Sequence, residues 1–225
     1  VQIMSIRAVP NGDEYDKDVA KAIRYAVDNG AQVINMSFGK AYSPHQKEVY
    51  EAFKYADSKG VLCVHAAGND HKDIDTEPNF PTSVYSFQDK KLDHFITIGS
   101  STRMTEEKLP SSFSNFGQKT VDVFAPGAQV YSTTPENEYD TKGGTSMAAP
   151  AVAGVAALIR SYYPQLSASQ VKHILMNSGT KINFDVIKPG TKDEKVPFTD
   201  LSVSGRVVNA YNAIKMADRM VKGKK

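Results

Sequence analysis

The chain has 225 residues, 40% of them hydrophobic, and a formal net charge of +2. This length suits a single α/β domain, and the nearly balanced charge gives no indication of a nucleic-acid partner. No apolar run is long enough to cross a bilayer, and no signal peptide is visible. The single cysteine, Cys63, excludes an intrachain disulfide, and its apolar surroundings favour a buried small hydrophobe over a reactive thiol.

Apolar periodicity predicts alternating strands and helices, which is the pattern of a mostly parallel sheet covered by helices on both faces. The predicted strands are residues 1–9, 33–38, 61–66, 95–99 and 121–124. The predicted helices begin near Asp16, Ser43, Ser146, Ser167 and Gly205, and the third of them ends near Tyr162. Ser167 and Gln170 have the spacing of a capping box.

One segment places a serine at the start of an apolar helix, in the string Gly143, Gly144, Thr145, Ser146 and then MAAP. Two glycines allow a sharp turn, and the small residues keep bulk away from a reacting carbonyl. The free amides at a helix start also face incoming negative charge. The segment is typical of a serine nucleophile, although an ordinary capped helix start would give the same string.

A second segment places an asparagine after an apolar strand, in the string Ala66, Ala67, Gly68, Asn69. A side-chain amide at the carboxyl end of a buried strand can donate to a developing oxyanion. A loop asparagine that satisfies its own turn is the alternative. Residues 33–39 (VINMSFG) repeat the pattern of a buried strand that opens into small or polar residues.

Together and in this order, INMSFG, AAGND and GTSMAAP resemble the subtilisin-like serine peptidases, and FSNFGQKTVDVFAPGAQVYST extends the resemblance. The resemblance implies a subtilisin-like α/β fold, with residues 1–225 forming a partial peptidase domain. It implies that Ser146 attacks a peptide carbonyl to give an acyl-enzyme. The side-chain amide of Asn69 and the backbone amide of Ser146 would form the oxyanion hole.

The general base and the carboxylate that orients it are not visible in the sequence. The family carries them in segments resembling Asp-Ser-Gly or Asp-Thr-Gly and His-Gly-Thr-His, and neither string occurs here. None of the histidines has the expected context; they are His45, His65, His71, His94 and His173. We therefore expect the carboxyl-terminal part of a longer enzyme, inactive by itself. The main alternative is a non-catalytic pseudo-peptidase or protein-binding module. The absence of GxSxG and GxGxxG disfavours a serine esterase and a nucleotide-binding protein.

The resemblance also implies a gap in the sheet, because the family's aspartate-bearing strand lies between residues 1–9 and residues 33–38. Each buried backbone group left unsatisfied would cost about 1–3 kcal/mol. We expect one of three outcomes. The two strands pair directly, the chain exchanges elements with a second copy, or an amino-terminal segment carrying the Asp and His binds as a partner.

The remaining predictions concern substrate, cofactors and location. An extended polypeptide substrate would bind by strand addition. The predicted substrate-binding residues are Ser37, Phe38 and Gly39 as the pairing edge, Ala66, Ala67 and Gly68 as one wall of the first specificity pocket, and Asn79 as its base. Asn79 would make that pocket shallower or more polar than a glycine would.

No cofactor is required for the chemistry. One acidic loop contains Asp70, Asp73, Asp75 and Glu77. This loop could hold structural calcium, but the spacing of its acidic residues matches no known calcium loop, so no metal site is predicted. Family analogy predicts secretion or export.

Overall fold

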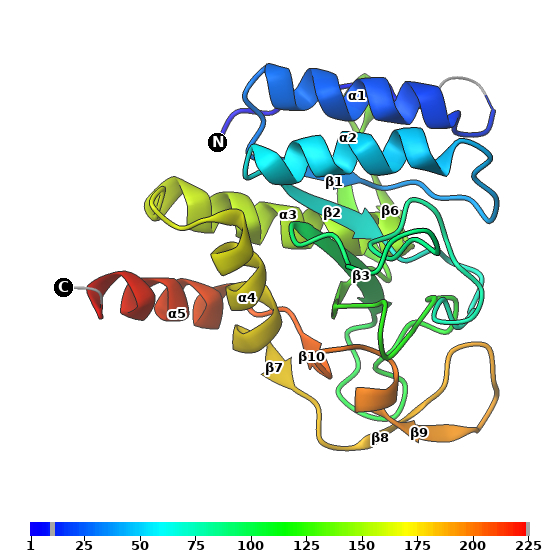
Figure 1. Cartoon of the computed structure of the whole chain (residues 1–225). Helices are drawn as coiled ribbons and strands as arrows, with labels where there is room; N and C mark the ends of the chain where they lie inside the picture. Colours follow the sequence, from blue (N-terminus) through cyan, green and yellow to red (C-terminus); the bar gives the residue numbers. More distant parts are fainter. Residues whose placement is uncertain (10–11, 224–225) are drawn as a thin grey trace.

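The computed structural model describes residues 1–9 and 12–223. Its centre is a six-stranded sheet in the order β1-β2-β3-β4-β10-β7, in which β7 is antiparallel to β10 and the other neighbours are parallel (Figure 1). The strands are β1 (Val33–Met36), β2 (Leu62–Ala66), β3 (Phe95–Ser101), β4 (Val123–Pro126), β7 (Thr180–Lys181) and β10 (Arg206–Val207). The helices are α1 (Asp16–Asp28), α2 (Gln46–Ser58), α3 (Thr145–Tyr162), α4 (Ala168–Ser178) and α5 (Ala210–Lys222).

One face of the sheet is covered by α1 and α2, which lie side by side (Figure 1). Both helices carry apolar residues at helical spacing, and Ile23 and Phe53 are buried there with Phe95 of β3. Cys63 lies in the same cluster with 2% exposure, and burial raises the pKa of its thiol. The predicted burial of Cys63 is confirmed, and its low reactivity stays a prediction.

The other face is covered by α3, α4 and α5. Their apolar residues pack against Leu62, Val64 and Ile98 of the central strands, which are fully buried. The predicted capping box at the start of α4 is present, because Ser167 Oγ accepts from the Gln170 N–H and the Gln170 side chain accepts from the Ser167 N–H. The predicted α/β fold, with helices on both faces of a mostly parallel sheet, is confirmed.

The prediction of a strand over residues 1–9 is wrong. This segment has no strand, and Ile6, Arg7 and Ala8 border a groove against α1 instead. Within residues 1–9 and 12–223, β1 is the terminal strand of the sheet and pairs only with β2, so direct pairing between the opening segment and residues 33–38 is also wrong. The physical reason is that a strand needs a neighbour within hydrogen-bonding distance, and no described strand pairs with residues 1–9.

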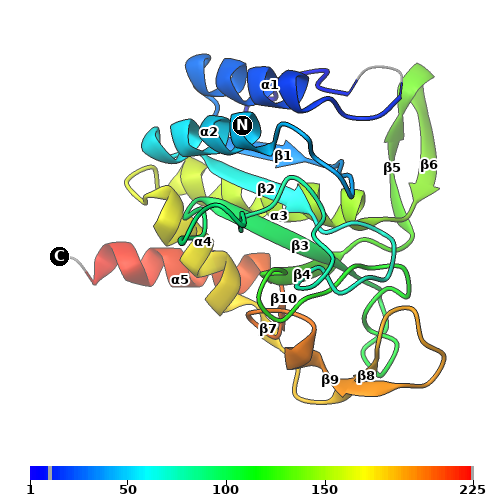
Figure 2. The same cartoon turned by 45° about the vertical axis from the view of Figure 1, so that its right-hand side comes forward.

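Two small hairpins complete the fold. β5 (Val130–Thr134) and β6 (Glu138–Lys142) are joined by a short 3-10 helix (Pro135–Asn137) and form an antiparallel ribbon that stands apart from the main sheet (Figure 2). The ribbon leads directly into α3. β8 (Asp185–Ile187) pairs with β9 (Lys195–Pro197), and a second 3-10 helix (Phe198–Asp200) follows.

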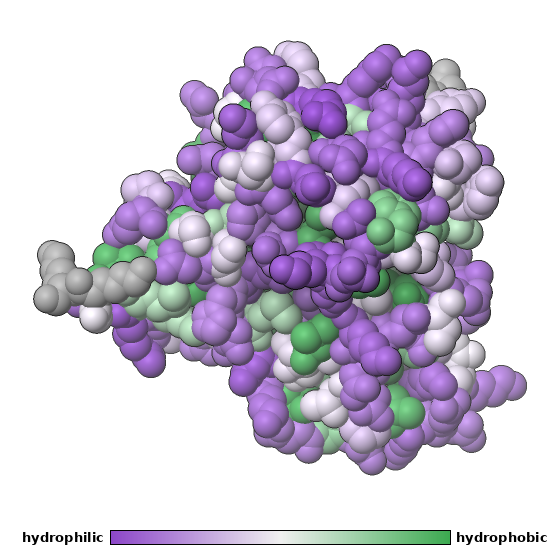
Figure 3. Space-filling model, in the orientation of Figure 1, coloured by the Kyte–Doolittle hydropathy of each residue, from purple (hydrophilic) through white to green (hydrophobic). Residues whose placement is uncertain are grey.

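The surface seen in Figure 3 is mostly hydrophilic, with smaller hydrophobic areas near α5 and in the lower part of the view. Among the described residues, no helix is both long and apolar enough to span a membrane.

Candidate active site

Ser146 is the second residue of α3, and the turn before it depends on Gly144, whose φ of +149° suits glycine. Ser146 Oγ donates to the carbonyl oxygen of Ser37 at 3.2 Å, and Ser37 Oγ donates to the carbonyl oxygen of Ser146 at 2.9 Å. Ser37 directly follows β1. This reciprocal pair of hydrogen bonds therefore joins the end of the edge strand to the start of α3.

Asn69 is held beside Ser146 through Thr145. The Asn69 Oδ1 atom accepts from the Thr145 N–H at 2.8 Å and from Thr145 Oγ1 at 3.0 Å. Thr145 Oγ1 in turn accepts from the Gly68 N–H at 3.1 Å. Because the amide oxygen is committed to Thr145, the orientation of the Asn69 amide is fixed and its nitrogen is the free end.

Two hydrogen-bond donors converge next to the serine. Asn69 Nδ2 and the Ser146 backbone nitrogen each lie 3.6 Å from the position that a Cβ on Gly144 would occupy. Within residues 1–9 and 12–223, neither donor has a hydrogen-bond partner. Two unpaired donors within 3.6 Å of one point, at the positive end of a helix, can stabilise an oxyanion.

Asn79 lies between two of the segments predicted to bind substrate. Its Nδ2 atom donates to the carbonyl oxygen of Ala67 at 3.0 Å. A Cβ on Gly39 would lie 2.6 Å from Asn79 Nδ2, and one on Gly68 would lie 3.2 Å from it. The structure thus brings Gly39, Ala67, Gly68 and Asn79 together, and the two glycines leave room for the amide between them.

The side chains of Ala66 and Ala67 are buried in two different core clusters, so they face the interior. Phe38 is half-buried against the core beneath α2, and its carbonyl oxygen accepts from His65 Nε2 at 2.8 Å. The side chains of Ala66 and Ala67 are therefore closed to a bound peptide, which can reach the main chain of these residues.

Two residues of this region were not assigned a role from the sequence. Asn115, which is buried, donates from Nδ2 to the Ala67 carbonyl at 2.9 Å and accepts at Oδ1 from the N–H groups of Asp70 and Lys72, both at 2.9 Å. It fixes both ends of the turn that carries Asn69; its only sequence signal is its place in the string FSNFG.

His65 is 1% exposed, and burial lowers its pKa to about 4, which keeps the ring neutral.

The comparisons with known proteins identify the family. The model of the subtilase family, peptidase S8, matches residues 1–205. The chain belongs to the subtilase family.

The relatives support this assignment along most of the chain. Thermitase from Thermoactinomyces vulgaris is 39% identical over 182 residues, which cover 80% of this chain and 58% of that protein. Subtilisin DY from Bacillus licheniformis is 38% identical over 165 residues, covering 73% of this chain and 55% of that protein. The chain therefore spans a little over half the length of these two relatives.

Solved structures show the same fold. The structure of a lanthipeptide protease matches with a TM-score of 0.72 and 27% identity, over 93% of this chain and 68% of that chain. The structure of the subtilase cytotoxin SubAB assembly matches with a TM-score of 0.77 over 97% of this chain and 71% of that chain; at 23% identity it supports the fold alone. The subtilisin-like fold expected from the sequence is confirmed.

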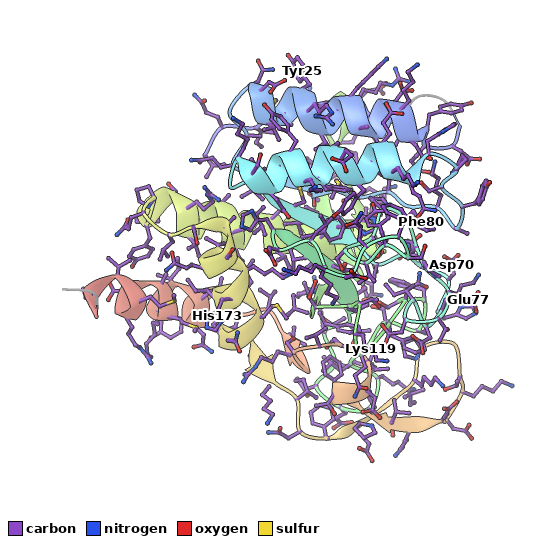
Figure 4. The ribbon with its side chains drawn as sticks, in the orientation of Figure 1. Tyr25, Asp70, Glu77, Phe80, Lys119 and His173 are labelled. Carbon is purple, nitrogen blue, oxygen red and sulfur yellow. The ribbon has the colours of Figure 1, made fainter. Side chains whose placement is uncertain are left out.

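The subtilase chain has no histidine hydrogen-bonded to Ser146 among its described residues. The His65 ring is hydrogen-bonded to the carbonyl oxygen of Phe38, and the His94 ring to Ser169. The His173 ring contacts Asn177, four residues further along α4. Figure 4 shows His173 on α4, far across the molecule from Phe80 and Asp70.

Two carboxylates of the acidic loop, those of Asp75 and Glu77, bind other groups of the protein. Asp75 accepts from the Lys119 N–H at 2.9 Å and from Thr120 Oγ1 at 2.5 Å, and Glu77 pairs with Lys72 at 3.0 Å. Asp70 and Glu77 lie on the loops at the right of Figure 4. Within the described part of the chain, no group of three or more His, Cys, Asp or Glu side chains is arranged to hold a metal ion. The absence of a required cofactor stays a prediction.

Proposed function

We propose that residues 1–225 are the nucleophile-bearing part of a serine endopeptidase domain. Ser146 Oγ attacks a peptide carbonyl carbon, the C–N bond breaks, and the amine leaves with a proton. Water then hydrolyses the acyl-enzyme. Asn69 Nδ2 and the Ser146 N–H stabilise the oxyanion in both steps. The observation that carries this proposal is the convergence of two unpaired donors beside a serine at a helix start.

The general base and its orienting carboxylate come, in this proposal, from an amino-terminal segment outside the chain. A serine hydroxyl is almost fully protonated at neutral pH, so Ser146 needs such a base. Two observations support this: no histidine is hydrogen-bonded to Ser146 among the described residues, and β1 has a neighbour on one side only. The unpaired edge of β1 offers main-chain donors and acceptors to an added strand. By itself the chain has no peptidase activity in this proposal, and its open edge favours self-association.

The proposed substrate is an extended polypeptide that pairs through its main chain with Ser37, Phe38 and Gly39. Asn79 narrows the first specificity pocket, since its amide lies between Gly39 and Gly68. We predict that Asn79→Gly, in the complete enzyme, shifts cleavage toward large aromatic residues before the scissile bond. A peptide library measures this shift. An unmodified enzyme that already prefers such residues would contradict the role of Asn79.

The proposed location is outside the cell or in its envelope. One relative, the cell wall-associated protease of Bacillus subtilis, is 29% identical over 233 residues, 98% of this chain and 24% of that protein. The chemistry proposed for Ser146 requires no cofactor, and the acidic loop is assigned no calcium.

The decisive experiment compares the chain alone with the protein that includes its upstream sequence. A fluorophosphonate reacts with an activated serine, and trypsin releases Ser146 in the peptide 143–160. We expect labelling of this peptide only when the upstream segment is present. In that longer protein, Asn69→Ala should lower kcat by about 10²–10³, a magnitude that was itself measured on a subtilisin. Ser146→Ala should lower it further.

A specific result would favour the alternative. An upstream sequence that lacks both the Asp and the His, together with no labelling of Ser146, would make the protein a pseudo-peptidase or binding module. Labelling of Ser146 in the chain alone would refute the assignment of the base to an upstream segment.

A further inference from the structure

A second serine lies at a helix start near the opposite end of the parallel strands. Ser169 is the exposed second residue of α4, and its Oγ lies 2.9 Å from Nε2 of His94. His94 immediately precedes β3, so it lies at the amino end of the parallel strands. Asn69, in contrast, lies beyond the carboxyl end of β2. The two serines are therefore separated by the length of the sheet.

The carboxylate of an aspartate lies near the other ring nitrogen of this histidine. The Oδ1 atom of Asp57, near the end of α2, lies 3.6 Å from His94 Nδ1. The carboxylate is held in place by the backbone, because it accepts from the N–H groups of His94 at 3.1 Å and Asp93 at 3.3 Å. The aspartate thus lies on α2, the histidine lies just before β3, and the serine lies at the start of α4. The histidine is between the other two side chains.

One ring tautomer of His94, with the proton on Nδ1, fits its surroundings. Nδ1 is buried and has no hydrogen-bond partner in the described residues, and the Asp57 carboxylate lies on that side of the ring. A proton on Nδ1 is stabilised by the carboxylate, which leaves the lone pair on Nε2 to accept the hydroxyl proton of Ser169. This is the protonation state that a general base needs.

The start of α4 also supplies donors. The capping box uses the Gln170 N–H, whereas the N–H groups of Ala168 and Ser169 have no partner in the part of the chain that the structure describes. Unpaired N–H groups at a helix start can stabilise negative charge that forms beside them.

We propose that Ser169 and His94 form a second, esterolytic site for small activated esters, with Asp57 as the positioning residue. Ser169 Oγ forms a bond to the acyl carbon while the Ser169 proton moves to His94 Nε2. The bond from the acyl carbon to the alcohol or phenol oxygen then breaks, and His94 passes that proton to the leaving oxygen, so that its Nε2 is free again. In the second step water adds to the acyl carbon and gives one proton to His94. The bond to Ser169 Oγ then breaks, Ser169 recovers a proton from His94, and the carboxylic acid leaves.

The test uses p-nitrophenyl acetate with the chain as it is. After an acid quench, trypsin releases Ser169 in the peptide 161–172, apart from Ser146 in 143–160, and fragmentation of the peptide locates the acetyl group. We expect acetylation of Ser169. We expect His94→Gln to slow it at least about tenfold, since a general base contributes about 10²–10⁴. Ser161→Ala is the matched control, because Ser161 is exposed in the same tryptic peptide and should leave the rate unchanged.

Asp57→Asn tests the positioning role. In ¹⁵N spectra of the His94 ring we expect the proton on Nδ1 in the unmodified chain and on Nε2 in the variant, with slower acetylation at unchanged far-UV circular dichroism. The proposal is overturned by absence of acetyl on Ser169, or by an equal rate in His94→Gln. Neither outcome bears on Ser146, because the two serines are read in separate peptides.

Discussion

The buried His65 makes the stability of this chain depend on pH in a predictable direction. Burial lowers its pKa from 6.5 to about 4 in the folded state, whereas the unfolded chain keeps the ordinary value. Between these two values the unfolded state binds more protons, so the free energy of unfolding falls as the pH falls. The contribution of His65 is fully present above pH 6.5 and is lost as the pH falls to about 4.

The magnitude follows from the two pKa values. A factor of ten in proton affinity corresponds to 1.36 kcal/mol, so the change from 6.5 to about 4 corresponds to about 3 kcal/mol. The matched variant is His65→Gln, which keeps an N–H donor for the Phe38 carbonyl but does not titrate. Urea unfolding at pH 7 and at pH 4 gives both free energies.

We expect the unmodified chain to lose about 3 kcal/mol more than His65→Gln between these two pH values. Other titrating groups, including the buried Asp122 whose pKa is raised by burial, are common to both proteins and cancel in the difference. Equal losses in the two proteins would refute the reasoning, because they would mean that His65 is protonated in the folded state without cost.

Two further substitutions test the hydrogen bonds that shape the site and its neighbourhood. Thr145→Val removes the hydroxyl that links Gly68 and Asn69 and leaves a Gly68 N–H without its acceptor, so urea unfolding should report a loss of about 1–3 kcal/mol; an unchanged midpoint would contradict this. Asp16→Ala removes a buried carboxylate that pairs with the partly exposed Lys40 at 2.8 Å and accepts from Ser43 Oγ and the His45 N–H, and the change should cost about 3 kcal/mol. The double variant Lys40→Met with Asp16→Ala should regain part of the lost free energy of unfolding. If it regains none, the unpaired charge of Lys40 is not the cause of the loss.

Local sequence patterns predicted most of the elements, because helices and buried strands are encoded by residues close together in the chain. The apolar spacing in residues 16–28 and 145–162, and the capping box at Ser167, each specify a helix without reference to distant residues. The β5–β6 hairpin was not predicted, since residues 130–142 are largely exposed and lack the alternation that marks a half-buried strand. Its pairing is visible only in three dimensions.

The sequence alone indicated the candidate side chains for the chemistry. They are a serine at a glycine-bounded helix start and an asparagine beyond a buried strand, with a subtilase order of segments around them. Only the tertiary structure decided how these groups are oriented. Thr145 commits the amide oxygen of Asn69, and Ser37 exchanges hydrogen bonds with Ser146 across 109 positions of sequence. It also decided that residues 1–9 form no strand and that Ser169 meets His94. Such contacts join residues far apart in the chain, and their formation depends on which neighbours the folded sheet supplies.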